Sequence, residues 1–454
     1  MSARLPAARA AARRAMPSAL LGLDEWLRVP SVSGDPRRRE YVAAAAHWIK
    51  RRLSRLTPNV RLIEAPGGPV VLARVRSAAS QPGSTTVVYG HLDVKEPGPG
   101  WTTPPFEPTL RGHRLIARGA SDDKGQLMAH IAALEAYAAI GGPPQDVAVI
   151  VDGAEEIGSP GLSHVLRSAE RESLLRGPVS SVVVSDTRMA GPGRPTLTVS
   201  QRGMLSLRVR VSTGDAPVHA GRFGGAVLDP SVVLARALLR TGRALEAMGA
   251  SNSPRAEAPT DASVRAAVRG RAVHADQPAA RSTVRGALTV TTLRAGAAAG
   301  SIPPTAEAVL DIRLPPGVEP APVLTQAIRL LRTDGVRTAV DCLGSVRGIS
   351  VEHPPEVLAA VRVACRLGFG TPPVTVASGG SIPAVRLLGD VFGQPPVLLG
   401  LGPANDGAHG PDEYLDLRDW ERGIDSCVCL LAALARAAAS RSCRETRLDR
   451  RSLR

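Results

Sequence analysis

The chain of 454 residues is 44% hydrophobic and 21% charged, which is typical of a soluble globular protein and excludes a fibrous or largely disordered chain. Its length favours two domains, because a single hydrophobic core stops growing at about 250–300 residues. Aromatic residues make up only 3%, which argues against a nucleic-acid site that stacks bases.

The net charge of +15 is carried largely by the two ends of the chain. Residues 1–14 contain four arginines and no acid, and residues 436–454 contain seven arginines and two acids. Such runs indicate solvated ends rather than a nucleic-acid surface, so we expect flexible tails at 1–18 and 438–454 and no nucleic-acid partner. An organelle transit peptide and an overextended reading frame are two further explanations of the first run.

The sequence contains neither a membrane span of about 18 uninterrupted apolar residues nor the apolar core of a secretory signal. The five cysteines are odd in number and lie late in the chain, which favours reduced thiols. We therefore expect a cytoplasmic protein without a membrane partner.

Four short apolar runs have the length of buried parallel strands, and polar residues of metal-binding type follow each of them. The runs are 85–89 before His91 and Asp93, 147–151 before Glu155 and Glu156, 181–185 before Asp186, and 397–401 before His409. Asp122 and Asp123 stand before a further segment, 126–139, whose apolar residues have helical spacing. Functional groups in open α/β sheets gather beyond the carboxyl ends of the strands, so these side chains are expected to converge.

Taken singly, each of these residues has an ordinary explanation, such as a helix-capping acid or a hydrogen-bonded loop histidine. The joint pattern is different, because every member stands at a strand end or a helix start. Imidazole nitrogens and carboxylate oxygens are ligands that Zn²⁺, Mn²⁺ and Co²⁺ accept. The sequence therefore predicts a metal site at the ends of these strands.

A segment of a different kind separates the third run from the fourth. Residues 205–213 alternate like a half-exposed strand, 229–239 are predicted to form a helix, and 288–293 and 308–314 are predicted to form further strands. The stretch 249–286 is rich in Ala, Arg, Ser and Pro and is expected to be a loop within this segment.

The predicted fold class is α/β, with a mixed, mostly parallel sheet that carries helices on both faces. Because the inserted segment separates His409 from the other candidate ligands, the metal-binding domain must be discontinuous. We expect it to comprise residues 1–205 and 347–454, and an α+β domain to be inserted at 206–346.

The motifs YGHLDV, GASDDKG, DGAEEIGSPGL, SDT and NDGAH occur in this order along the chain. The set resembles the co-catalytic zinc metallopeptidase superfamily of carnosinase-type dipeptidases, acetylornithine deacetylase, succinyl-diaminopimelate desuccinylase and carboxypeptidase G. The resemblance covers about residues 20–435. Three further stretches resemble the dipeptidase branch in particular: QRG at 201–203, GGSIP at 379–383 and the segment around His219.

The resemblance implies two divalent metal ions, with zinc as the first expectation and manganese or cobalt as alternatives. Asp122 would bridge both ions. His91 and Asp186 would complete one metal site, and Glu156 and His409 would complete the other.

The resemblance also implies roles for the neighbours of these ligands. Asp93 would orient the imidazole of His91, and the peptide bond from Asp122 to Asp123 is a candidate for a cis bond. Glu155 is not needed as a ligand, so it is free to take a proton from the attacking water and pass it to the leaving amine.

The inserted domain would act as a lid and as the surface of a homodimer. His219 would stabilise the oxyanion of the attacked carbonyl, often from the partner subunit in such dimers, although a surface loop histidine is the alternative. Arg313 would hold a substrate carboxylate, with an ordinary strand-end arginine as the alternative. The loop of Gly379, Gly380 and Ser381 would line the substrate cleft.

Two positions depart from the dipeptidase pattern. Ser378 stands where carnosinase-like enzymes often have Glu, and Gly300 stands where relatives often have Asn or Thr. The predicted function is a dipeptidase or related amino-acid-amide hydrolase that acts on small peptides. An N-acyl amino acid deacylase, a natural-product tailoring amidohydrolase with the same metal centre and a non-catalytic binding homologue are the alternatives.

Overall fold

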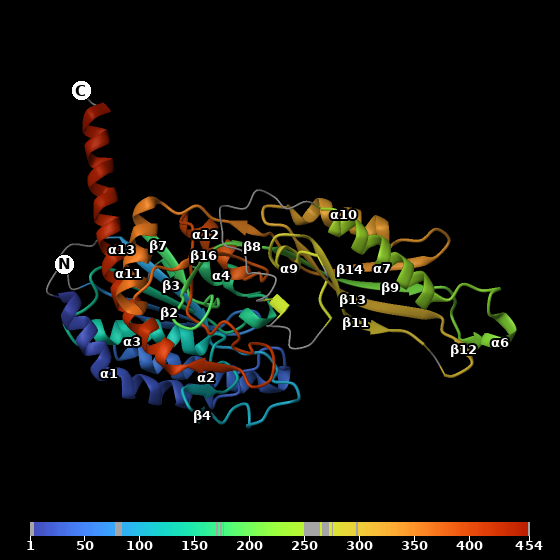
Figure 1. Ribbon diagram of the computed structural model, residues 1–454, viewed down its shortest axis with the longest axis horizontal. Coiled ribbons are helices and arrows are strands. Elements are labelled where there is room, and N and C mark those ends of the chain that lie inside the picture. Colours follow the sequence, from blue (N-terminus) through green and yellow to red (C-terminus); the bar gives the residue numbers. More distant parts are fainter. Residues whose placement is uncertain are drawn as a thin grey trace. The chain divides into compact units, whose positions relative to one another are not determined.

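The computed structural model describes residues 4–77, 84–168, 171–172, 175, 177–248, 264–265, 272–274, 276–296 and 298–452, with side chains up to residue 441. The described chain divides into two compact units, drawn in Figure 1. Unit 1 comprises Met1–Thr198, Glu352–Thr375 and Ile382–Arg454, and unit 2 comprises Val199–Val351 and Val376–Ser381. The borders after Thr198 and Val351 lie a few residues from those expected from the sequence, whereas Val376–Ser381, expected in the metal-binding domain, belongs to unit 2.

Unit 1 is built on a mixed sheet with the strand order β1-β2-β6-β3-β7-β17-β8. Its strands are β1 (Val60–Ile63), β2 (Val70–Val75), β3 (Thr85–His91), β6 (Asp146–Asp152), β7 (Val179–Val184), β8 (Thr196–Gln201) and β17 (Val397–Gly400). The central neighbours β6, β3, β7 and β17 are parallel, and the outer pairs are antiparallel. The four central strands coincide with the four apolar runs of the sequence.

The central strands are largely apolar because both faces of the sheet are covered. Every residue of β3 and β6 is buried, which explains a continuous apolar run in place of the alternation of a half-exposed strand. The histidine and acidic side chains of β3 and β6 stand at strand ends: His91 ends β3, and Asp146 and Asp152 are the first and last residues of β6. The expected α/β fold with a mixed sheet is confirmed. The sheet is not mostly parallel as predicted, because in this strand order only the three central pairs are parallel and the outer pairs are antiparallel.

Helices cover this sheet, as Figure 1 shows. They are α1 (Arg4–Leu27), α2 (Arg39–Ser54), α3 (Lys124–Ala138), α4 (Leu162–Leu166), α11 (Pro355–Phe369), α12 (Pro383–Phe392) and α13 (Leu417–Ser452), with short 3-10 turns η1 (Pro36–Arg38) and η2 (Glu155–Ile157). Helix α3 packs on β3 and lies against α1 and α13, and α11 packs on α13. Helix α2 packs on β1 and β2, and α12 packs on β7. Three further strands, β4 (Thr109–Arg111), β5 (Arg114–Ile116) and β18 (Tyr414–Asp416), form a small separate sheet.

The first arginine-rich end differs from the expected flexible tail. Arg4–Leu27 forms helix α1, which buries Leu5, Ala8 and Ala12 against its neighbours. Alanine and arginine both have high helix propensity, so a run rich in both can form a helix whose alanines face the core. At the other end, α13 continues to Ser452 and contains most of 438–454.

One helix among the described residues is long and apolar enough to cross a membrane by length and composition. It is Leu417–Arg441 within α13, and 61% of its 18-residue apolar window is buried inside the protein. Its contacts with α1, α3 and α11 are those of a core helix.

Unit 2 is built on an antiparallel sheet with the order β11-β13-β9-β14. Its elements are β9 (Gly203–Ser212), β10 (Val218–His219), α6 (Ala220–Phe223), α7 (Pro230–Glu246), α9 (Pro278–Thr283), β11 (Ala287–Arg294), β12 (Ser301–Ile302), β13 (Thr305–Leu314), α10 (Pro320–Leu331), β14 (Arg337–Val346) and β15 (Ile349–Ser350), and β16 (Val374–Ser378) runs across the border. Alternate residues of β9 and β13 are buried, because α7 and α10 pack on one face of the sheet (Figure 1). Of the loop expected at 249–286, residues 249–263, 266–271 and 275 lie outside the described residues, and in the described part Pro278–Thr283 forms helix α9 instead of loop.

Candidate metal centre

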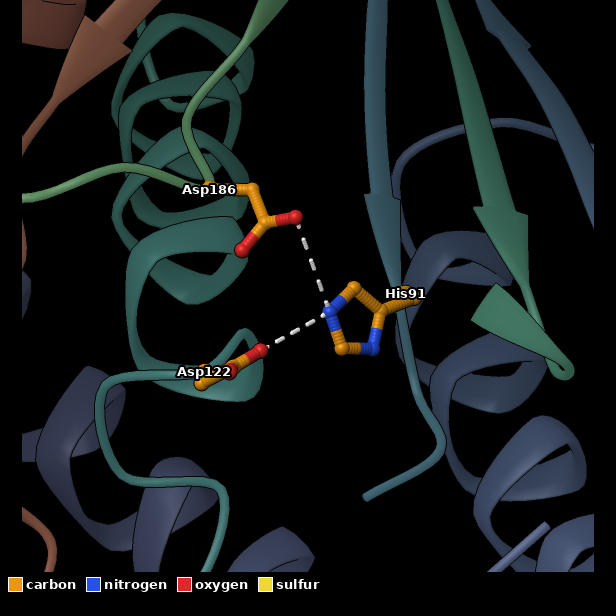
Figure 2. Close-up of side chains that lie close together, drawn as sticks. All are labelled: His91, Asp122 and Asp186. Carbon is orange, nitrogen blue, oxygen red and sulfur yellow. Dashed lines mark hydrogen bonds and ion pairs between the residues drawn. The ribbon is translucent and has the colours of Figure 1, made fainter. Parts of the chain in front are cut away.

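The parallel strands of unit 1 bring the first group of predicted ligands together. His91 ends β3, and Asp186 follows the neighbouring strand β7 after one residue. The Nε2 atom of His91 lies 3.1 Å from Oδ1 of Asp122 and 3.9 Å from Oδ2 of Asp186. The three side chains point toward one another, as Figure 2 shows. Neighbouring parallel strands end at the same edge of a sheet, which is why residues 95 positions apart in the chain meet here.

A second group lies on the other side of Asp122. The Nε2 atom of His409 lies 3.2 Å from Oδ2 of Asp122 and 3.2 Å from Oε2 of Glu156. The two carboxylate oxygens of Asp122 therefore face different histidines. Within each group the candidate ligand atoms lie within 4.8 Å of one another, so each group could hold a metal ion. This grouping is the one that the family resemblance implies, and the individual ligand roles remain a prediction.

The electrostatics of the centre fit divalent cations. Burial raises the pKa of Asp186 to about 6, and repulsion from Asp122 and Glu156 adds to the effect. Burial also raises the pKa of Glu155 well above its usual value, with repulsion from Asp186 among the further causes. Carboxylates gathered in a buried site favour a positive charge between them, and their oxygens together with two imidazoles form a donor set suited to zinc.

The peptide bond between Asp122 and Asp123 is cis, which confirms the expectation from the resemblance. The two adjacent acids do different things. Asp122 faces both histidine rings, whereas Asp123 is fully buried and its Oδ2 accepts a hydrogen bond from the backbone N of His91 at 3.1 Å. Asp123 therefore holds the end of β3 on which His91 stands.

Asp93 has a wider role than the one predicted for it. Its backbone oxygen lies 3.0 Å from Nδ1 of His91 and its Oδ1 lies 3.4 Å from the same nitrogen, so both can orient the ring. In addition, Oδ1 accepts from the backbone N of Glu155 at 3.1 Å and Oδ2 from that of Glu156 at 3.0 Å. Ser33 Oγ donates to Oδ2 at 2.6 Å. One buried carboxylate thus positions a predicted ligand and the turn that carries the two glutamates.

The turn at η2 sends the two adjacent glutamates into different surroundings. The Glu156 carboxylate contacts His409 and lies 3.2 Å from Nζ of Lys95. Among the described residues, no hydrogen bond or ion pair engages the carboxylate of Glu155. Within the described part of the chain, the Glu155 carboxylate is therefore not held by another side chain or backbone group.

The sequence from residue 87 to residue 433 matches the peptidase family M20/M25/M40. The chain belongs to this family. It is 28% identical over 448 residues to the Cys-Gly metallodipeptidase dug1 of Schizosaccharomyces pombe, across 88% of this chain and 92% of the relative. It is 26% identical over 453 residues to the Beta-Ala-His dipeptidase of Homo sapiens, across 88% of this chain and 87% of that one. Its fold matches that of the di-peptidase Dug1p from Saccharomyces cerevisiae with a TM-score of 0.82 at 23% identity, covering 96% of this chain and 99% of that one.

The remaining predicted residues of this M20/M25/M40 peptidase lie in unit 2, near opposite ends of strand β13. His219 is exposed on β10, which pairs with β12 just before β13 begins. The backbone N of Ala220 donates to the oxygen of Gly300 at 2.7 Å, so the departure at Gly300 lies beside the His219 segment. Arg313 stands near the far end of β13, about 25 Å along the strand from its start at Thr305.

The predicted substrate loop packs around Arg313 within unit 2. The Arg313 guanidinium donates to both carboxylate oxygens of Asp311, at 2.8 and 2.9 Å, and to Ser381 Oγ at 3.2 Å. A Cβ at Gly379 would collide with the backbone oxygen of Ser282, so a larger residue does not fit there. Gly380 donates its backbone N–H to Oγ of Ser378, the second position that departs from the dipeptidase pattern.

Two basic side chains that the sequence did not single out lie close to the predicted ligands. Lys95 Nζ donates to the backbone oxygen of Glu156 at 2.6 Å. Arg188 Nε lies 2.8 Å from Oδ1 of Asp406. Each stands a few residues after a predicted ligand in the chain, but this signal is weak because surface cations occur at the same spacing.

Proposed function

We propose that this M20/M25/M40 peptidase is a cytoplasmic dipeptidase with two divalent metal ions at its catalytic centre. The observation that carries the proposal is the pair of histidine and carboxylate groups that share Asp122. His91 and Asp186 would hold one ion together with Asp122, and Glu156 and His409 would hold the other. Zinc suits two imidazoles and three carboxylates best, and manganese or cobalt would also fit the donor set.

When bound, two divalent ions polarise the scissile carbonyl and make a water molecule more acidic. Glu155 would accept the proton of that water and deliver it to the leaving amine nitrogen. Its carboxylate has no hydrogen-bond partner in the described part of the chain, which supports this role because a general base must exchange its proton with the reactants. Asp93 would keep Glu155 and Glu156 apart by holding both of their backbone N–H groups.

Unit 2 would supply the groups that recognise the substrate. His219 would donate a hydrogen bond to the developing oxyanion, and Arg313 would exchange its contact with Asp311 for the substrate carboxylate. The two side chains stand near opposite ends of β13. This separation supports a homodimer in which one subunit provides Arg313 and its partner provides His219.

Unit 2 has an edge suited to such a dimer. Among the described strands, β11 pairs only with β13, so its outer side presents unpaired backbone groups. Val290 and Leu293 on β11 are exposed, as are Val232 and Leu239 on the adjacent helix α7. Exposed apolar side chains beside an open strand edge are typical of a protein–protein interface.

Dipeptides are the proposed substrates, in keeping with the named activities of the two relatives described above. Ser378 and Gly300 favour one rival, an N-acyl amino acid deacylase, because both positions leave the dipeptidase pattern in segments expected near the substrate. A tailoring amidohydrolase with the same centre would belong to the same chemical class. The distinction lies in whether the substrate has a free amino group next to the scissile bond.

A substrate panel tests the proposal directly. The purified protein, loaded with zinc, manganese or cobalt, is incubated with dipeptides that include Cys-Gly and β-Ala-His, and with N-acetyl and N-succinyl amino acids. We expect dipeptide cleavage that a chelator abolishes and that added metal restores. Cleavage of the N-acyl compounds alone would select the deacylase, and chelator-resistant activity would refute the metal centre.

A further inference from the structure

Glu413 is a fully buried carboxylate with four hydrogen-bond donors around it. Its Oε1 accepts from the backbone N–H groups of Ser121 at 2.8 Å and Asp122 at 3.0 Å. Its Oε2 accepts from the backbone N–H of Gly119 at 3.0 Å and from the Arg118 guanidinium at 2.6 Å. The exposed fraction of Glu413 is 0%. The Glu413 side chain therefore binds three backbone N–H groups of the segment 119–122, which ends at Asp122.

The chemistry of these contacts requires an ionised carboxylate. All four partners are donors, so a protonated carboxyl group would have no acceptor among them, and an amide would place its NH₂ against two donors whichever way it turned. The nearby Arg118 guanidinium, itself buried, supplies the opposite charge. A buried charge is tolerated only when it is paired and fully hydrogen-bonded, and Glu413 meets both conditions.

Glu413 also lies on the segment that carries His409. Strand β18, which begins at Tyr414, pairs with β5. The backbone N of Ala117 donates to the backbone oxygen of Glu413 at 3.0 Å. Asp406, on the same segment, accepts from Ser121 Oγ at 2.7 Å. The side chains of Asp406 and Glu413 thus hold the segment around residue 410 against the segment around residue 120.

We propose that Glu413 is a positioning residue that sets the place of the Asp122 carboxylate relative to His409 and so determines metal affinity. This inference rests on the proposed dinuclear centre. Because Asp122 belongs to both ligand groups, a shift of its backbone changes both at once. Among the described residues, the Glu413 carboxylate makes no hydrogen bond or ion pair with the side chain of a predicted ligand, and its contact with Asp122 is to that residue's backbone N–H.

Cobalt titration of the metal-free protein, followed by visible absorption, tests the role of Glu413. We expect wild type to bind two Co²⁺ ions with an absorption spectrum that reports the ligand geometry. Glu413→Gln should bind both ions about 10–100-fold more weakly, the usual effect of losing a group that orients a metal ligand, and with an altered spectrum. Glu421→Gln is the matched control, because Glu421 is an exposed acid on the first turns of α13, and it should behave like wild type.

The outcomes separate this inference from the function on which it rests. If wild type does not bind two Co²⁺ ions, the dinuclear centre itself fails. If wild type binds them and Glu413→Gln binds them with the same affinity and spectrum, the positioning role is refuted, even when thermal unfolding shows the variant to be less stable. Should Glu413→Gln not fold, Glu413→Asp replaces it, since the shorter carboxylate keeps the charge but cannot reach all four donors. Glu413→Asp should bind Co²⁺ more weakly than wild type, and equal binding would overturn the proposal.

Discussion

At the scale of single residues, the hydrogen bonds of Asp93 place the adjacent Glu155 and Glu156 side chains in different surroundings. Asp93 accepts the backbone N–H groups of both Glu155 and Glu156, which fixes the turn between them. Glu156 then faces His409, whereas the carboxylate of Glu155 has no partner among the described residues. The hydrogen-bonded turn therefore gives the two adjacent carboxylates different surroundings.

Glu155→Gln tests whether Glu155 acts as the general base and Glu156 as the metal ligand. We expect turnover to fall by about 10²–10⁴-fold, because the amide cannot accept the proton, while the metal content stays at the wild-type level. Steady-state kinetics and elemental analysis of the same sample give both quantities. Loss of metal together with activity would assign Glu155 to the ligands instead, and unchanged turnover would refute its role as base.

At the scale of elements, helix α1 shows how a charged run can be part of a core. Leu5 is 3% exposed, and the Arg4 guanidinium donates to the backbone oxygen of Gly142 at 2.8 Å. Arg9 forms an ion pair with Asp425 of α13 at 2.6 Å. Two of the four arginines that suggested a solvated tail, Arg4 and Arg9, therefore reach the neighbouring elements, while the apolar face of the helix is buried.

Paired substitutions within α1 test its contribution to stability. Leu5→Ala should lower the free energy of unfolding by about 2–5 kcal/mol, because it leaves a cavity beneath the helix. Leu21→Ala, at a site that is 61% exposed in the same helix, should change it by less than about 0.5 kcal/mol. Chemical denaturation of both variants measures the difference. Equal effects would show that the first turns of α1 do not pack on the core.

At the scale of the whole molecule, the central question is which chain provides His219. Unit 2 places His219 and Arg313 at sites separated by most of the length of β13. The open edge at β11 and its exposed apolar side chains support a symmetric dimer. In such an assembly a catalytic centre would be complete only when two subunits are present.

Mixed dimers of two inactive variants test this arrangement. His219→Ala and Glu155→Gln are each expected to have little activity alone. After dissociation and reassociation of an equimolar mixture, half of the dimers should be mixed, and one of their two centres would combine an intact Glu155 with an intact His219 from the partner. We expect recovery of about a quarter of the wild-type rate. No recovery, with mixed dimers verified by mass spectrometry, would place His219 in the same chain as the centre it serves.

Much of the fold could be predicted because its signals are local. Continuous apolar runs such as 85–89 indicate strands buried on both faces, and the polar residue that ends each run marks the edge where ligands gather. The four central parallel strands follow from this rule. The helix at Arg4–Leu27 could not be predicted in this way, because a run of alanines and arginines has the same composition whether it packs on a core or stays in solvent.

The sequence by itself determined the reaction class and the residues brought to the centre, since His91, Asp122, Glu156, Asp186 and His409 lie in short motifs whose order and spacing are distinctive. Only the tertiary structure decided which oxygen of Asp122 faces which histidine and that Glu413 gathers the backbone before Asp122. The contacts of Asp122 with His409 and with Glu413 join segments almost 300 residues apart. Strand order and loop packing create such contacts, and no local pattern in the chain encodes them.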